Sequence, residues 1–370
     1  MEKIMKILIM GFSKLKYMPY INFYLDNIDC ENNNIHVLYW NRDCKSEDKS
    51  KYHSVIFHEF SSFQEDDVIK SKKICNFVKY REYAKSILIN SNFDFIIVLH
   101  TITAIVVMDI LIKHYNKKYI LDYRDSTYEE NFIFQKLIHV LVNHSKLTFI
   151  SSDAFRKYLP ANTQIYTSHN ILLDSFKHRD EKIKYGTHSE KIRIGFWGFI
   201  RHEDINRQII EKISKDSRFE LHYYGREQNI AKNLKNYTEE LQADNIFFHG
   251  EYRPEERYEF IRNIDIIHNI YYDNNMMLAM GNKYYDGIIF YLPQLCFTGS
   301  FMGRMAKKAA IGLECDPANH NFTNEINNYY TSISQEIFRI NCDIEVNRVI
   351  DEYKKSVQLL NTALTEDSYE

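Results

Sequence analysis

The sequence has little net charge, no clustered cysteines and no long apolar run. Its 47 lysine and arginine residues nearly balance 50 aspartate and glutamate residues, which leaves a net charge of −3. This balance argues against a protein built mainly to bind nucleic acid, because such proteins need many positive charges to contact the phosphates. The six cysteines include no Cys-x-x-Cys pair and no tight cluster with histidine. Neither a disulfide scaffold nor a metal site is therefore expected.

The longest apolar stretch, 95–108, is shorter than the ~20 residues that span a bilayer. Near the start of the chain, Gly11 interrupts the apolar run 7–10 before it is long enough for the core of a signal peptide, which favours a first strand there. We therefore expect a soluble, cytoplasmic protein. Hydrophobic residues make up 45% and charged residues 26% of the 370 residues, and this length predicts two globular domains.

Short β-type runs alternate with helical patterns in the first half of the chain. The runs predict strands at 6–10, 35–40, 55–60, 95–99, 118–123, 147–151 and 163–166. The helical spacing of apolar residues and a capping serine or aspartate predict helices at 67–90, 103–115, 130–144 and 152–158. This alternation is typical of a parallel sheet with helices on both faces.

The pattern stops in the polar stretch 177–191 and then starts again. Strands are predicted at 192–197, 219–224, 246–249, 265–270 and 294–297, and helices at 204–216, 229–242, 254–262, 282–290, 302–310 and 344–364. The sequence therefore predicts an α/β protein with two doubly wound, Rossmann-like domains, 1–180 and 191–343, which face a central cleft. A C-terminal helix, 344–370, is expected to pack back towards the N-terminal domain.

Four stretches of the second half follow one another in a characteristic order. They are IRIGFWGFIRHED (192–204), LHYYGREQN (221–229), NIFFHGEYRPEERYEFIRNIDIIHNI (245–270) and GNKYYDGIIFYLPQLC (281–296). Together they resemble the C-terminal domain of GT-B glycosyltransferases, especially the retaining family 4 enzymes of bacterial polysaccharide biosynthesis. The resemblance implies the GT-B architecture, a nucleotide-sugar donor held by the C-terminal domain, an acceptor on the N-terminal side, and no metal or other cofactor.

The sequence departs from this family at its Glu-x7-Glu motif. Leu278 stands where the first glutamate is expected, and Asp273 is acidic but out of register. The way in which the donor sugar is recognised is therefore open, and backbone amides at 280–282 could hold it instead.

The same stretches contain the chemistry that a diphosphate needs. Gly198 follows a strand, where the lack of a side chain lets the backbone approach a phosphate. Arg201 lies just beyond it, and a guanidinium fork matches phosphate oxygens. A plain surface charge is the alternative for Arg201, and it is the favoured interpretation for Arg207. The resemblance adds Gly225, Arg226 and Tyr252 to the donor site.

The helix predicted at 282–290 supplies the rest of the expected donor site. Asn282 could cap this helix, and the free amides of the first turn suit a diphosphate. Lys283, with Arg201, would neutralise the leaving diphosphate, and both are predicted catalytic residues. Asp286 stands where the family binds the ribose of the donor; a solvated helix residue is the alternative.

Candidate residues of the first half follow predicted strands. His100 follows the strand 95–99, and the resemblance implies contact with the transferred sugar or the acceptor; a structural histidine is the alternative. Arg124 and Asp125 could orient an acceptor hydroxyl or take its proton, which makes Asp125 a catalytic candidate with His100. A local salt bridge that holds the loop explains the pair equally well. Gly11 and His169 are the remaining acceptor-side candidates.

The leading hypothesis is a glycosyltransferase of the hexosyltransferase type. It would move a sugar, with retention of configuration, from a nucleotide-diphosphate sugar to a saccharide or lipid-linked saccharide in the synthesis of a cell-surface polysaccharide such as a capsule. A nucleotide-sugar epimerase on the same fold and a degenerate transferase acting as a partner subunit are the alternatives. Several lysines of the first half could contact the anionic inner face of a membrane, or could form an ordinary solvated surface; they are Lys14, Lys16, Lys70, Lys72, Lys73 and Lys79.

Overall fold

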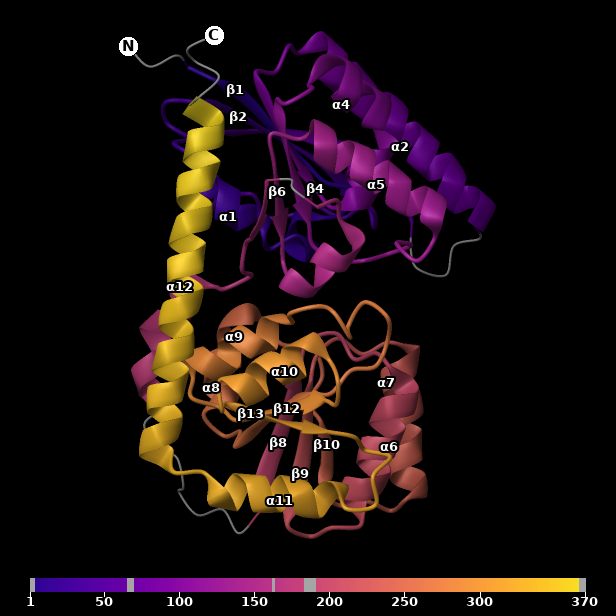
Figure 1. The fold of residues 1–370 in the computed structure, drawn as a ribbon. Coiled ribbons are helices and arrows are strands. Elements are labelled where there is room, and N and C mark those ends of the chain that lie inside the picture. The colour runs from indigo at the N-terminus through magenta and orange to yellow at the C-terminus, as the bar shows by residue number, and fades with distance from the viewer. Residues whose placement is uncertain (1–3, 65–69, 162–163, 183–190, 366–370) are drawn as a thin grey trace. The chain divides into compact units, whose positions relative to one another are not determined.

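The computed structural model of the protein describes residues 4–64, 70–161, 164–182 and 191–365. The chain forms two compact units, one of Met1–His169 with Glu352–Glu370 and one of Asn170–Asp351 (Figure 1). Each unit is built on one parallel β-sheet. The predicted α/β class with two parallel sheets is therefore confirmed.

The first unit contains a seven-stranded sheet in the order β3-β2-β1-β4-β5-β6-β7. Its strands are β1 (Lys6–Met10), β2 (Asn34–Asn41), β3 (Val55–Ser61), β4 (Phe95–Leu99), β5 (Tyr119–Tyr123), β6 (Leu147–Ile150) and β7 (Ile165–Thr167). Strands β4 and β5 are buried along their whole length, as continuous apolar runs in a covered parallel sheet should be. The strand order reverses between β1 and β4. Loops that leave the carboxyl ends of these two strands therefore lie next to each other, which is where ligands bind in such sheets.

Short and long helices connect these strands. They are η1 (Leu15–Tyr17), α1 (Ile21–Leu25), α2 (Lys70–Asn90), α3 (Thr101–Val106), α4 (Met108–His114), α5 (Phe132–His144) and η2 (Asp153–Tyr158). The last part of α12 (Gln335–Thr365) also belongs to this unit. There, Asn27 donates a hydrogen bond to the hydroxyl of Tyr353 over 2.8 Å, and Ser356 donates one to the carbonyl of Thr167, also over 2.8 Å.

The second unit contains a six-stranded sheet in the order β10-β9-β8-β11-β12-β13. Its strands are β8 (Ile192–Trp197), β9 (Phe219–Tyr224), β10 (Ile246–Phe248), β11 (Ile266–Asn269), β12 (Gln294–Phe297) and β13 (Gly312–Cys315). Its helices are η3 (Leu173–Lys182), α6 (Glu203–Ser214), α7 (Asn229–Glu240), η4 (Pro254–Glu256), α8 (Arg257–Ile261), α9 (Asn282–Ile289), α10 (Phe301–Lys308) and α11 (Phe322–Ser332). The order reverses between β8 and β11, so the turn after β8 adjoins the loop after β11.

Several elements differ from the sequence-based expectation. Strand β13 and the helices η1, α1, η3 and α11 were not predicted. The helix predicted at 103–115 is divided at Val107 into α3 and α4, and the one predicted at 254–262 is divided into η4 and α8. The final helix begins at Gln335 rather than at 344. The predicted boundary between the domains lies at 180–191, whereas the compact units meet at His169 and Asn170, with η3 in the second unit; residues 183–190 lie outside the described part of the chain.

Candidate functional site

Three glycine turns lie at the carboxyl ends of neighbouring strands in the second unit. Gly198 follows β8 with a φ of 119°, a conformation that favours glycine. Its amide donates to the carbonyl of Tyr224 over 2.9 Å, and the amide of Gly225 donates to the carbonyl of Gly250 over 2.7 Å. A Cβ atom on Gly225 would lie 1.7 Å from the carbonyl oxygen of Gly198. Only glycine at 225 therefore permits the two turns to pack together.

Lys283 places its ammonium beside the first of these turns. A Cβ atom on Gly198 would lie 3.9 Å from Nζ of Lys283, and this Nζ lies 4.4 Å from the ring centre of Phe196 and 5.2 Å from that of Tyr271. Within the described residues, the ammonium has these aromatic contacts but no hydrogen-bonded or ion-paired partner. Burial lowers the pKa of Lys283 to about 7; Arg201 adds to this effect and Asp286 opposes it.

The start of α9 corrects one prediction about Asn282. The N-cap residue is Gly281, and no side chain caps the helix, whereas Asn282 is the first helical residue and is exposed. The expected capping role of Asn282 is therefore wrong. The amide of Tyr284 donates to the carbonyl of Gly281 over 3.0 Å, whereas no side chain occupies the amides of Asn282 and Lys283, which remain available to an anion.

Asp286 is buried on α9, where it contacts residues of β8 and α8. Its Oδ2 accepts a hydrogen bond from the indole of Trp197 over 2.8 Å, and its Oδ1 lies 3.5 Å from Nη1 of Arg257. Arg257 in turn donates to the hydroxyl of Ser175 over 3.0 Å and to that of Tyr258 over 3.1 Å. Asp286 is only 4% exposed, so the solvated-residue alternative is wrong. Each carboxylate oxygen keeps a lone pair that could accept from a ribose hydroxyl.

The other donor-side candidates occupy different environments. Arg201 is exposed, with its guanidinium 5.7 Å from the ring of Phe199. Arg226 is also exposed. Tyr252 is half-buried with its ring 5.1 Å from that of Phe260, and burial raises its pKa to about 12, with the charge of Asp286 acting in the same direction. Arg201, Arg226 and Tyr252 follow the parallel strands β8, β9 and β10, so they lie at the same edge of the sheet as Gly198 and Gly225.

Arg207 makes an ordinary surface ion pair. Its guanidinium lies 2.9 Å from a carboxylate oxygen of Glu203, one turn earlier on α6, and 4.6 Å from the ring of Tyr237. This geometry agrees with the favoured interpretation of Arg207 as a surface charge.

In the first unit, Gly11 and His100 lie where the strand order reverses. His100 is buried at the end of β4, with a left-handed φ of 73°, and its ring centre lies 4.9 Å from that of Phe12. Its Nδ1 accepts a hydrogen bond from the amide of Ile102 over 3.3 Å. Burial lowers the pKa of His100, while the charge of Asp125 opposes this. Gly11 is closely packed, because a Cβ atom there would lie 2.4 Å from the sulfur of Met18.

Arg124 and Asp125 have separate environments. Arg124 is buried and pairs with Asp122, its Nε 2.5 Å from Oδ1, and it also donates to the carbonyl of Ser168 over 3.0 Å. Arg124 therefore makes a local salt bridge with Asp122. Asp125 is exposed at the end of the same strand. His169 is buried, with Nε2 2.7 Å from a carboxylate oxygen of Glu352 on α12.

Of the lysines predicted to contact a membrane, Lys14 does not have a free side chain. Its ammonium is buried, 2.5 Å from Oδ1 of Asp43 and 3.1 Å from the carbonyl of Lys45, so this part of the prediction is wrong. Lys16, Lys72 and Lys79 are exposed and Lys73 is half-buried, whereas the side chain of Lys70 lies outside the described part. No helix in the described ranges is both long and apolar enough to cross a bilayer.

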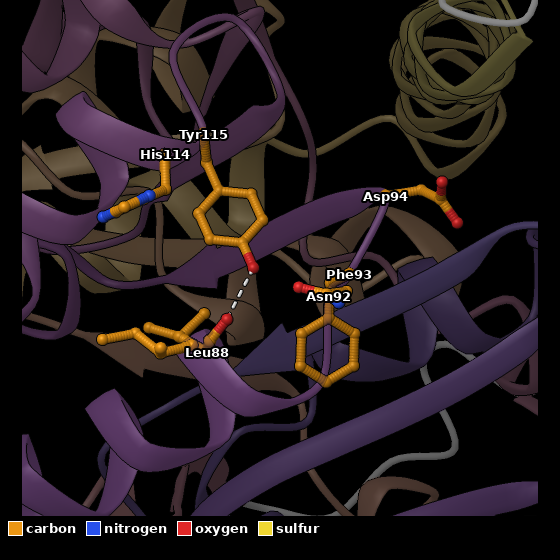
Figure 2. Close-up of a pocket in the computed structure, with 7 residues that line it drawn as sticks. Leu88, Asn92, Phe93, Asp94, His114 and Tyr115 are labelled. Carbon is orange, nitrogen blue, oxygen red and sulfur yellow. Dashed lines mark hydrogen bonds between the residues drawn. The ribbon is translucent and has the colours of Figure 1, made fainter.

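A pocket of about 360 Å³ lies away from all of these residues. Figure 2 shows its lining at the ends of α2 and α4 and at the start of β4, where the hydroxyl of Tyr115 donates to the carbonyl of Leu88 over 2.8 Å. This is the amino end of the strand, opposite the edge that carries His100. In the described residues, no group of three or more histidine, cysteine, aspartate or glutamate side chains could hold a metal ion.

Comparison with known proteins places this geometry in a fold class. No protein-family model and no curated protein match the sequence. Among solved structures, the chain is similar to HepE from Anabaena in complex with UDP and glucose, with a TM-score of 0.69, 13% identity, and coverage of 97% of this chain and 100% of that one. It is also similar to sucrose-phosphate synthase from Thermosynechococcus elongatus, with a TM-score of 0.73, 11% identity and 98% coverage of both chains. The chain has the GT-B fold.

One further structure with this similarity is described as an epimerase. Its description is "putative UDP-N-acetylglucosamine 2-epimerase from Listeria monocytogenes", with a TM-score of 0.60, 10% identity, and coverage of 92% of this chain and 91% of that one. The structures that resemble this chain therefore include one named as a synthase and one named as an epimerase.

Several residues at this edge of the second sheet were not found from the sequence. Trp197 and Arg257 hold Asp286, and His202 lies 3.4 Å from Asp273. Of these residues, only Trp197 could have been placed at this edge from the sequence, because it ends a predicted strand next to a glycine. The other contacts join loops that are far apart in the sequence, and spacing carries no information about them.

Asn206 was also missed, although it fixes the turn that carries Arg201. Its Nδ2 donates to the carbonyls of Arg201 and His202 over 2.8 and 3.0 Å. Its Oδ1 accepts from the hydroxyl of Tyr223 over 2.8 Å and lies 3.1 Å from Nε2 of His268. A buried amide that satisfies four groups holds the turn after β8 in one conformation.

Proposed function

We propose that this protein is a glycosyltransferase that moves a sugar from a nucleotide-diphosphate donor to a saccharide or lipid-linked saccharide acceptor. The observation that carries the proposal is the ammonium of Lys283, which lies against two aromatic rings beside the Gly198 turn and makes no salt bridge or hydrogen bond within the described chain. A buried cation without a partner is costly, and a phosphate group arriving at this turn would supply the missing negative charge.

The chemistry of this site follows from where charge develops. When the bond between the sugar and the diphosphate breaks, negative charge grows on the leaving phosphate. Lys283, Arg201 and the uncapped amides of α9 are donors that need little rearrangement to meet that charge, so they would stabilise the transition state more than the ground state. We propose retention of configuration, in which the leaving phosphate itself helps to take the proton from the acceptor hydroxyl.

Asp286 is proposed to accept hydrogen bonds from the ribose of the donor. Trp197 and Arg257 fix its position, and this would make the ribose contact rigid. Among similar structures, HepE is described with UDP and with UDP-glucose, so uridine nucleotides are the first donors to test.

We assign the acceptor to the first unit, at the edge that carries His100 and Asp125. Burial keeps the imidazole of His100 neutral at pH 7, since it lowers the pKa from an ordinary value of 6.5. Because Nδ1 accepts from the amide of Ile102, the neutral ring carries its proton on Nε2, which can donate a hydrogen bond to an oxygen of the acceptor. The exposed carboxylate of Asp125 can orient the acceptor hydroxyl or take its proton. The exposed lysines of this unit would allow contact with an anionic membrane, and synthesis of a cell-surface polysaccharide is the proposed setting.

The test is incubation of the full chain with UDP-, GDP-, CMP- and dTDP-sugars, with and without a mixture of oligosaccharides and extracted bacterial lipids as acceptors. Nucleotide release that requires the acceptor mixture supports a transferase. Interconversion of nucleotide sugars without an acceptor would instead identify the epimerase, the alternative that one similar structure favours. Absence of any nucleotide binding would indicate the degenerate partner subunit and contradict the proposal.

A further inference from the structure

His202 has an imidazole whose position is fixed by the backbone. It is the N-cap residue of α6, with a left-handed φ of 63°, directly after Arg201. The side chain of Asn206 holds the carbonyls of both residues, as described above. The His202 side chain is 13% exposed, and its ring centre lies 5.7 Å from that of Tyr271, one of the two rings that enclose the Lys283 ammonium. The imidazole therefore belongs to the same cluster as the proposed phosphate-binding groups.

Asp273 fixes which nitrogen of this imidazole faces a carboxylate. Oδ2 of Asp273 lies 3.4 Å from Nδ1 of His202, while Oδ1 accepts a hydrogen bond from the amide of Met276 over 2.7 Å. A carboxylate beside Nδ1 favours the tautomer that carries its proton there. Nε2 is then an acceptor.

Nε2 of His202 is buried and has no hydrogen-bond partner in the described part of the chain. Buried polar atoms in proteins are almost always paired, so one that lies in a candidate site points to a missing ligand atom. Burial lowers the pKa of His202, and the positive charges of Arg201 and Lys283 act in the same direction while Asp273 opposes them. The ring therefore stays neutral at pH 7.

A neutral acceptor nitrogen requires a hydrogen-bond donor as its partner. It repels the lone pairs of a phosphate oxygen and accepts from a hydroxyl. The groups next to it, Lys283 and Arg201, are those proposed to hold the diphosphate, and the group joined to a diphosphate in a nucleotide sugar is a ring that carries several hydroxyls. The side chain of Leu278, which follows Asp273 in the same loop, is apolar and cannot accept from such a hydroxyl.

We propose that Nε2 of His202 accepts a hydrogen bond from a hydroxyl of the donor sugar, and that Asp273 is a positioning residue that holds the imidazole in the required tautomer. This inference rests on the proposed function, because it concerns the sugar of the same donor. It assigns recognition of the sugar to a His–Asp pair from the turn after β8 and the loop after β11.

The test is His202→Asn in the full chain. Asparagine adopts the left-handed conformation readily but is too short to place an acceptor at the position of Nε2. Calorimetry would measure the affinities for UDP and for a panel of UDP-sugars. We expect the affinity for the preferred UDP-sugar to fall about threefold to tenfold, as for one lost hydrogen bond, while the affinity for UDP changes less than about twofold. Gln242→Asn is the matched control, because Gln242 is also left-handed, with a φ of 53°, and exposed.

Asp273→Asn tests the positioning role separately. Its side-chain oxygen still accepts from the amide of Met276, but the charge beside Nδ1 is lost. We expect a smaller loss of affinity for the UDP-sugar, together with a change in the 15N chemical shifts of the His202 ring, whose signals are assigned by their absence in His202→Asn. Unchanged ring shifts would contradict the positioning role.

Two outcomes would overturn the inference and are distinguishable from each other. If His202→Asn lowered the affinities for UDP and for the UDP-sugar by the same factor, or changed neither affinity, His202 would not take part in recognition of the sugar. The proposed function would still stand. If the wild-type protein bound no nucleotide sugar of any base, the proposed function and this inference would both fail.

Discussion

The charge of Lys283 makes the affinity for a nucleotide diphosphate depend on pH. Burial lowers the pKa of this lysine to about 7 in the free protein. A bound diphosphate favours the charged form, so the pKa rises in the complex. Below about pH 6 the lysine is protonated in both states and affinity does not change. Above pH 7 binding must take up a proton, and affinity falls until the pH reaches the pKa of the complex.

The size of the effect follows from the protonated fraction. A group with a pKa of 7 is about 90% protonated at pH 6 and about 10% protonated at pH 8. The affinity for UDP should therefore fall roughly tenfold between these values, which is about 1.4 kcal/mol. The neighbouring imidazoles do not contribute, because burial lowers the pKa of His202 and lowers that of His268 to about 3.

Calorimetric titration of UDP from pH 6 to 9 would measure this dependence, and buffers with different ionisation enthalpies would count the proton taken up. Lys283→Arg is the matched control, because arginine keeps its charge throughout this range, and the variant also corrects for ionisation of UDP itself. Lys283→Ala should bind UDP roughly tenfold to a hundredfold more weakly at pH 6 and approach the wild type at pH 9. Equal pH profiles for the wild type and Lys283→Arg would refute the assigned role of this lysine.

Three further changes test the structure around this site. Asp286→Ala removes the partner of the buried Arg257 guanidinium, so we expect the free energy of unfolding to fall by about 3 kcal/mol and the Tm in calorimetry to fall by roughly 6–12 °C. An unchanged Tm would show that this contact does not stabilise the fold. Gly225→Ala should lower Tm and abolish UDP binding, since its Cβ would overlap the carbonyl oxygen of Gly198, and a variant that binds normally would contradict the close packing of the turns. Arg207→Ala should change stability by less than about 0.5 kcal/mol and leave UDP affinity unaltered, as expected for a surface pair.

The sequence and the structure predict different effects on stability when the side chain of Asp286 is removed, and the difference has a physical reason. From the sequence, a polar residue one turn into a helix is expected to face the ligand and contribute little to stability. In the structure it joins α9 to Trp197 and Arg257 in the interior. Asp286→Asn, which keeps an acceptor for the indole of Trp197, is therefore the better variant for measuring a ribose contact.

Periodicity and turn signals were enough to predict the two parallel sheets. The strands predicted at 95–99 and 265–270 coincide with β4 and with β11, which spans Ile266–Asn269, and glycines at 198, 225 and 250 fall at strand ends. Strand β13 was missed because its sequence, GLEC, lacks β-branched residues, and α11 was missed because its sequence is mostly polar. Local pattern does not encode these elements, which packing against their neighbours stabilises.

Pairings between distant loops could not be predicted from the sequence. In the sequence, Lys14 resembles an exposed lysine of a basic stretch, but in the structure its side chain is buried and pairs with Asp43. His202 follows an arginine in an unremarkable turn, and only the reversal of strand order between β8 and β11 brings it to Asp273. The glycines of the candidate site and Lys283 could therefore be predicted from sequence motifs. The contacts that support them depend on the topology of the sheet and could not.

The central claim is that the second unit holds a nucleotide-sugar donor at the Gly198 turn and Lys283. Saturation-transfer NMR of the full chain with UDP-, GDP-, CMP- and dTDP-sugars at pH 6.5 measures this most directly. We predict transfer to the ribose and sugar protons of at least one donor, displacement by the matching nucleoside diphosphate, and a strong reduction in Lys283→Ala. Absence of transfer from every donor, or equal transfer in Lys283→Ala, would contradict the claim.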